Sequence, residues 1–178
     1  MGLRVRKRGH YTRDKKVCVR IAISPGDPAL PAHAYGSVAN PRRWVEVSLD
    51  TGTTATDFSK LCQAIMDDID QNEPGNDERY FLWDNLRLHL APLVYQTVHG
   101  RAGIRLYHIL PRPPYQPKWG PIEYIICQLA ERLGARIHSI NNLQHLQEAI
   151  MTIVPQLTSF DATFVHCGYS TAGKYLHK

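Results

Sequence analysis

The spacing of apolar residues changes repeatedly along residues 17–110, and the order of the changes constrains the fold. From Val17 to Ile23, apolar side chains occupy every second position, which indicates a strand with one buried face. Trp44–Asp50 alternates in the same way, so the two segments predict an opening pair of strands. From Phe58 to Ile69, apolar residues recur every three or four positions, which predicts an amphipathic helix. Thr54 and Asp57 have the capping-box spacing that begins such a helix.

Helix and strand patterns continue to alternate after this helix. Asp70–Glu78 is acidic, contains Gly and Pro, and predicts an exposed loop. Tyr80–Trp83 is wholly apolar, which predicts a strand covered on both faces. A short helix is expected from Ala91-Pro92, and a further strand over Ile104–Leu110. This alternation predicts an α/β fold with parallel strands.

Prolines and a second set of helical patterns fill the rest of the chain. Pro111–Gly120 contains four prolines and predicts a rigid connector, with a Pro-rich ligand for an SH3 domain as the alternative. The connector is favoured because the segment lies between a strand and a helix of one core. An apolar stripe from Pro121 to Leu133 predicts a helix, and another helix is expected after Asn142.

Length and composition restrict the classes of protein that fit. A chain of 178 residues that is 43% hydrophobic can form one domain with a core. No apolar run approaches the ~18 residues that span a membrane, and the N-terminus has no apolar segment typical of a secretory signal. We therefore expect an intracellular protein, nuclear in a eukaryote and cytoplasmic otherwise. Cys62 and Cys127 fall on apolar helical positions and are expected to be buried thiols.

Positive charge is concentrated at the N-terminus. Residues 1–20 hold eight Lys and Arg against one acid, a net charge of +7, whereas the remaining residues sum to −2. Residues 1–14 are thus interpreted as a basic arm for nucleic-acid binding or nuclear import, and a solvated tail is the alternative. The candidate nucleic-acid-binding residues are Arg4, Arg6, Lys7, Arg8, Lys15 and Lys16.

Two carboxylates occupy positions where α/β enzymes bind ligands. Asp84 follows an expected strand, at the end where open α/β sheets place their ligands. The alternative is that Asp84 and Asn85 only form a turn. Glu123 falls on the first turn of the helix from Pro121, where the helix dipole favours an acid in any case. Paired carboxylates can bind Mg²⁺, while His89 either orients a phosphate or packs.

The order of these motifs resembles the C-terminal catalytic half of mariner-type DDE transposases. The resemblance rests on Asp84-Asn85 with His89 after one strand, Leu110–Pro117 after the next, and Gly120-Pro121-Ile122-Glu123-Tyr124; it covers about residues 9–157. It implies a ribonuclease H-like mixed sheet flanked by helices. It also implies that Asp84 and Glu123 are the second and third acids of a catalytic triad, with Asn85 and His89 in support.

The resemblance further implies cofactors and partners. Related transposases use two divalent cations, Mg²⁺ or Mn²⁺, which activate water or a DNA 3′-hydroxyl for attack on a phosphodiester. DNA is accordingly the expected partner, and a homodimer is expected by the same likeness. Neither a small-molecule substrate nor a membrane is expected.

The first acid of the triad has no convincing counterpart. Asp14 lies in the basic stretch, Asp27 lies in a turn, and Asp50 falls on the solvent side of its expected strand. Smaller departures are Gly120, where the family usually has Asn, and a longer Pro-rich loop. We therefore expect a partial catalytic domain over residues 15–157 that lacks the first central strand, followed by a tail over 158–178.

Such a truncated domain is expected to be inactive alone. The alternatives are a non-catalytic nucleic-acid-binding protein derived from a transposase, and a chain without a stable fold.

Overall fold

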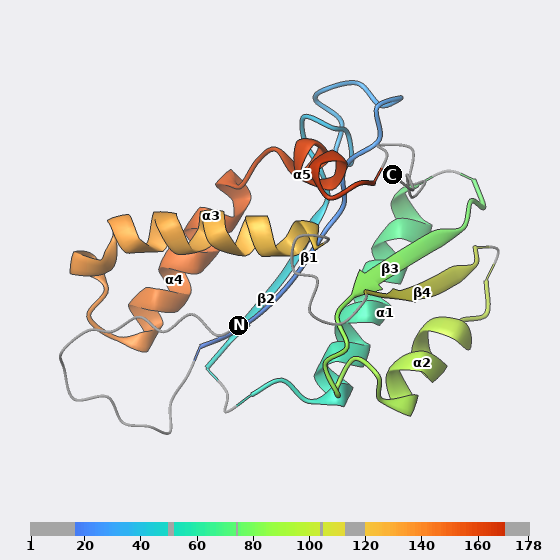
Figure 1. Ribbon diagram of the computed structural model, residues 1–178, viewed down its shortest axis with the longest axis horizontal. Coiled ribbons are helices and arrows are strands. Elements are labelled where there is room, and N and C mark those ends of the chain that lie inside the picture. The colour runs from blue at the N-terminus through green and yellow to red at the C-terminus, as the bar shows by residue number, and fades with distance from the viewer. Residues whose placement is uncertain (1–16, 50–51, 74, 104, 113–119, 170–178) are drawn as a thin grey trace. The chain divides into compact units, whose positions relative to one another are not determined.

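The computed structural model describes residues 17–49, 52–73, 75–103, 105–112 and 120–169 (Figure 1). Helices and strands both occur, which confirms the α/β class. The chain forms two compact units. The first unit comprises Met1–Gly52 and Ile122–Thr163, and the second comprises Thr53–Pro121 and Phe164–Lys178.

The first unit is built on an antiparallel pair of strands. β1 (Cys18–Ile23) and β2 (Arg43–Ser48) pair from Cys18 opposite Ser48 to Ile23 opposite Arg43, as the alternation predicted. Their apolar face packs against α3 (Pro121–Ala135) and α4 (Leu143–Ile153). The residues at the centre of this core are Ile125, Leu129, Leu133, Ile150, Ile153, Val154, Leu157 and Phe160.

The two edges of the β1–β2 pair differ. The Ser24 amide donates to the Arg42 carbonyl, so even-numbered residues of β1 bond to β2 and Val19, Ile21 and Ile23 turn their backbone groups away. The outer edge of β2 is partly satisfied, because the Gln147 side chain on α4 donates to the Val47 carbonyl at 3.1 Å. Within the described ranges, no strand pairs with the other edge of β1.

The second unit combines two helices with a parallel pair of strands. α1 (Ala55–Asn72) and α2 (Pro92–His99) lie beside β3 (Arg79–Trp83) and β4 (Tyr107–Pro111) (Figure 1). The strands pair from Arg79 with Tyr107 to Trp83 with Pro111, and the parallel direction confirms the prediction. The buried hydrophobic residues of these elements are Leu61, Cys62, Ile65, Met66, Ile69, Trp83, Val94, Val98 and Tyr107.

The capping box at the start of α1 is present as predicted. The Thr54 hydroxyl accepts a hydrogen bond from the Asp57 amide at 3.2 Å, and the Asp57 carboxylate accepts one from the Thr54 amide at 3.0 Å. Two otherwise unsatisfied amides at the helix start are therefore paired. Pro92 likewise begins α2, where its missing N–H costs nothing.

The end of α1 and the start of β4 differ from the sequence expectations because of contacts with residues distant in the sequence. α1 continues to Asn72 and does not end before Asp70, because Asp70 is engaged by Arg101 and Tyr107. β4 begins at Tyr107 and not at residue 104, because the buried Arg105 side chain binds carbonyl groups that follow α1.

Two burial expectations were wrong. β3 is not covered on both faces, since Tyr80 is 52% exposed while Trp83 is buried. Cys127 is exposed, because it lies on the outer side of α3, whereas Cys62 is buried as expected. Burial raises the pKa of the Cys62 thiol to about 12, so that thiol stays protonated at neutral pH.

The remaining described residues form short helices. Two 3₁₀ turns, Ile137–Ser139 and Val154–Gln156, flank α4, and α5 (Phe160–His166) lies in the stretch expected to be a tail. Most of the Pro-rich connector, at residues 113–119, lies outside the described residues, as does the basic arm. None of the helices in the described ranges is both long and apolar enough to cross a membrane.

Candidate catalytic site

Asp84 follows β3 directly, and the residues on both sides of it are hydrogen-bonded to the backbone of Arg112. The Arg112 amide donates to the Trp83 carbonyl at 2.8 Å. The Asn85 side-chain amide donates to the Arg112 carbonyl at 2.9 Å. Asp84 thus lies between two residues that are both bonded to Arg112. Its position at the carboxyl end of the parallel pair is the one where α/β sheets bind ligands.

The two oxygens of the Asp84 carboxylate have different environments. Oδ1 accepts a hydrogen bond from the Leu86 amide at 3.1 Å and lies 2.7 Å from Nδ1 of His89. Oδ2 makes no hydrogen bond among the described residues, and the side chain is 49% exposed. The bond to Leu86 forms the turn that the sequence offered as an alternative. Asp84 therefore closes a turn with one oxygen and keeps the other open to a ligand.

His89 is held between the carboxylate and an aromatic wall. Its ring lies 4.2 Å from that of Phe58 in α1, at an interplanar angle of 33°, and 6.0 Å from that of Trp83. The side chain is 18% exposed. His89 therefore interacts with Asp84, as a supporting residue would. Sequence reasoning missed Phe58, because its helical spacing indicated only a core position.

Glu123 lies on the first turn of α3, as the sequence predicted. Ile122 and Ile125 on either side of it pack into the core of the first unit, which fixes this turn of the helix. Glu123 is partly buried. It belongs to the first unit, whereas Asp84, Asn85 and His89 belong to the second.

The donor chemistry at Asp84 suits a hard divalent cation. Mg²⁺ takes carboxylate oxygens, commonly from one or two protein carboxylates, and keeps several waters. Oδ2 of Asp84 is such a donor. Over the part of the chain that the structure describes, no group of three or more His, Cys, Asp or Glu residues could hold a metal ion. Asp84 by itself therefore offers a single ligand and not a complete metal centre.

The other acids considered from sequence do not add to the site. Asp27 accepts the Ala29 amide at 2.8 Å and closes a turn, as expected. Asp14 and Asp50 lie outside the described residues, and so do all six candidate basic residues of the arm.

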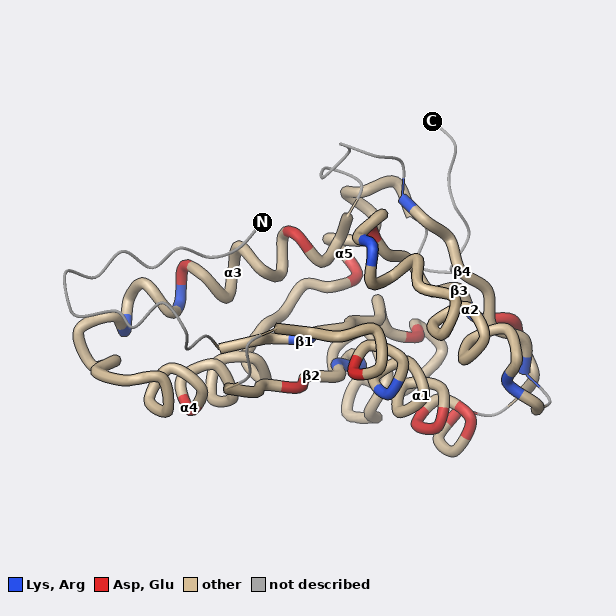
Figure 2. Tube along the Cα trace, turned by 90° about the horizontal axis from the view of Figure 1, so that it is seen from below, with Lys and Arg blue, Asp and Glu red and all other residues tan. Residues whose placement is uncertain are grey.

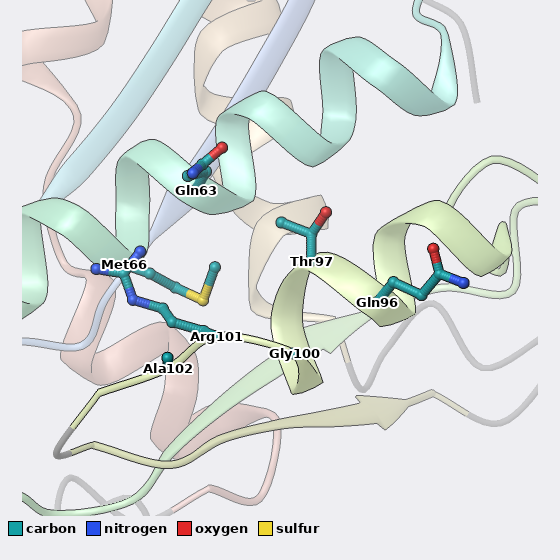
Figure 3. A pocket seen from close by; sticks show the side chains of 7 residues that line it. All are labelled: Gln63, Met66, Gln96, Thr97, Gly100, Arg101 and Ala102. Carbon is teal, nitrogen blue, oxygen red and sulfur yellow. The ribbon is translucent and has the colours of Figure 1, made fainter.

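A pocket of about 460 Å³ lies elsewhere in the second unit (Figure 3). Among the described residues that line it, the cationic side chain is Arg101, which is already paired with Asp67 at 2.8 Å and with Asp70 at 2.7 Å, on the acidic helix α1 (Figure 2). An anion would have to compete with two carboxylates there. The pocket contains no candidate site residue; it is lined by Gln63, Met66, Gln96, Thr97, Gly100, Arg101 and Ala102.

The comparison with family models agrees with the motif order. The family model described as DDE superfamily endonuclease matches residues 4–147. A solved structure described as "Mos1 transposase paired-end complex with left transposon end" is similar, with 16% sequence identity and a TM-score of 0.43. The similarity covers 90% of this chain and 55% of that chain. The comparison with curated proteins found no match.

Proposed function

The chain belongs to the DDE superfamily endonucleases, and we propose that it is a partial catalytic domain of a mariner-type transposase. The chemistry of such a domain is metal-dependent cleavage and joining of DNA, so DNA is the proposed partner. One observation carries the proposal. Asp84 stands at the carboxyl end of a parallel strand with one oxygen held and the other open, inside the region that the family model matches.

Asp84 and Glu123 are the proposed ligands of Mg²⁺ or Mn²⁺. A bound cation would supply Lewis acidity, which activates water or a DNA 3′-hydroxyl and stabilises charge on the phosphate. The chain's own residues have simpler roles. Asn85 fixes the end of β3 through Arg112, while the Leu86 amide and His89 hold the Asp84 carboxylate. Oδ2 is the oxygen that would bind a cation.

We propose that the domain is incomplete as a nuclease. Neither β1 nor β3 pairs with a third strand in the described ranges. In β3, Arg79 and Trp83 bond toward β4, so the backbone groups of Tyr80 and Leu82 face away. Each such group costs about 1–3 kcal/mol if it is buried unpaired. An additional strand against either edge would pair its open backbone groups, and an acid on such a strand would add a ligand for the cation.

A plasmid-nicking assay tests this proposal. The full chain is incubated with supercoiled DNA and either Mg²⁺ or Mn²⁺, beside the Asp84→Ala variant. We expect no nicking above the variant's background. Robust cleavage that Asp84→Ala abolishes would show that the chain carries a complete catalytic site and would contradict the proposed inactivity.

A non-catalytic nucleic-acid-binding protein is the second candidate, favoured by the net charge of +7 over residues 1–20. Each Lys or Arg that contacts a phosphate adds about one to the slope of log affinity against log salt. Replacing Arg4, Arg6, Lys7, Arg8, Lys15 and Lys16 by Gln should then weaken DNA binding and flatten that slope. A double variant, Asp84→Ala with Glu123→Ala, should keep binding. Binding indifferent to the six replacements would rule out the arm as the DNA-binding element.

A further inference from the structure

We infer that His89 is a positioning residue for Asp84: it occupies Oδ1 and thereby leaves Oδ2 as the atom that meets a divalent cation. This inference rests on the proposed function, because it assumes a cation at Asp84. It adds to the proposed function which oxygen of Asp84 binds the cation and which residue determines the choice of that oxygen. The starting observation is that both donors to the carboxylate, the Leu86 amide and Nδ1 of His89, reach the same oxygen.

A turn alone does not require this arrangement. A hydrogen bond from the amide two residues ahead is sufficient for the turn that follows Asp84. The bond to His89, five residues ahead, adds a second donor to an oxygen that is already satisfied. Two donors from different directions fix the plane of a carboxylate that is half exposed and would otherwise rotate. The direction of Oδ2 is fixed with it.

His89 is itself held in place by the core of the second unit. Its ring packs at a tilt against that of Phe58 at 4.2 Å, and Phe58 packs edge-on against Trp83 at 5.3 Å. Trp83 is 7% exposed, so it anchors the group to the buried face of β3. The contacts therefore run from Trp83 through the rings of Phe58 and His89 to the Asp84 carboxylate. These contacts limit how far that carboxylate can rotate.

A fixed oxygen has a specific consequence for the cation. Mg²⁺ demands near-octahedral geometry, so a ligand that is oriented in advance loses less freedom when it binds. Removal of a side chain that hydrogen-bonds a metal ligand typically lowers metal affinity about 10–100-fold. We expect a loss at the lower end of this range, because the Leu86 amide still holds Oδ1.

Two substitutions at His89 distinguish the contribution of its hydrogen-bond donor from that of its aromatic ring. His89→Phe keeps a ring on Phe58 and removes the donor, whereas His89→Asn places an amide nitrogen near the position of Nδ1. The isotope-labelled full chain is titrated with Mn²⁺, and paramagnetic broadening of the Leu86 amide signal is followed by NMR. We expect about tenfold weaker Mn²⁺ binding for His89→Phe and a partial return toward wild-type affinity for His89→Asn. Thermal melts establish that each variant is folded.

The outcomes distinguish this inference from the proposed function. If Asp84→Asn leaves the broadening unchanged, the cation does not bind at Asp84 and both proposals fail. If Asp84→Asn abolishes it but His89→Phe binds Mn²⁺ as tightly as wild type, only the role of His89 is overturned. Should His89→Phe not fold, Phe58→Leu removes the ring that packs against His89 and leaves both polar groups. We expect Phe58→Leu to weaken Mn²⁺ binding, and wild-type affinity would contradict the inference.

Discussion

The side-chain amide of Asn85 donates a hydrogen bond of 2.9 Å to the backbone carbonyl of Arg112. Asn85→Asp keeps the shape of the side chain but sets a carboxylate oxygen against that carbonyl. We expect the free energy of unfolding to fall by about 1 kcal/mol, because the hydrogen bond is lost and two acceptors then face each other at an exposed residue. Urea unfolding measures the change. Asn141→Asp, at an exposed position outside any helix or strand, is the matched control and should stay within about 0.5 kcal/mol of wild type.

Arg105 holds together the segment that links α1 to β3. Its side chain is 2% exposed and donates to the carbonyls of Glu73, Gly75 and Asp77. Arg105→Ala should lower the free energy of unfolding by about 3 kcal/mol, since three carbonyls lose their donor. Arg132→Ala removes one exposed bond to the Gln156 carbonyl and should cost under about 1 kcal/mol. Similar losses for both variants would refute the structural role of Arg105.

The capping box makes a separate prediction for α1. Thr54→Ala removes the hydroxyl that accepts from the Asp57 amide, and helix caps of this kind contribute about 1 kcal/mol. We expect chemical denaturation to show a loss of that size with an unchanged slope against denaturant. Thr54→Ser retains the hydroxyl and should remain close to wild type. An equal loss in both variants would mean that the methyl group, and not the cap, stabilises the helix.

Asp70 predicts a pH dependence of stability. Burial raises the pKa of Asp70, but hydrogen bonds from Tyr107 and Arg101 and the charges of Arg101 and Arg105 outweigh burial, so the pKa lies below its ordinary value of 3.8. A depressed carboxyl pKa stabilises the fold above pH 3.8, and the stabilisation is lost as pH falls through the lower value.

The Asp70→Asn variant tests that dependence. Its deficit in unfolding free energy relative to wild type should be constant above about pH 5 and should shrink as the pH falls below about 4. Urea titrations at several pH values between 2.5 and 6 measure it. A deficit that does not change with pH would contradict the assignment of the shift to Asp70.

Local sequence predicted the parts of the fold that depend on neighbouring residues. The β1–β2 pair, the start of α1 at Thr54 and the start of α3 at Pro121 follow from alternation, capping and proline placement. The extension of α1 past Asp70 could not be predicted, because its cause is Arg101 and Tyr107, more than thirty positions further along. The late start of β4 has the same kind of cause in Arg105.

The candidate site was predictable to a similar degree. The pattern of an apolar strand followed by Asp placed Asp84 at the end of β3, and helical spacing placed Glu123 on a first turn. The hydrogen bonds that give Oδ1 and Oδ2 of Asp84 different environments could not be predicted from the spacing of residues in the sequence. They depend on the ring of His89, whose position is set by Phe58, a residue 31 positions earlier on another element.

Iron-directed cleavage of the polypeptide tests most directly the claim that Asp84 and Glu123 bind one cation. Fe²⁺ replaces Mg²⁺ in the full chain, and ascorbate with peroxide then generates radicals that cut the backbone near the bound ion. We expect fragments that end near Asp84 and near Glu123. Both sets should disappear with excess Mg²⁺, in Asp84→Asn and in Glu123→Gln, and persist in the control Glu131→Gln on the same helix. Cleavage near Asp84 that is unchanged in Glu123→Gln would contradict the claim.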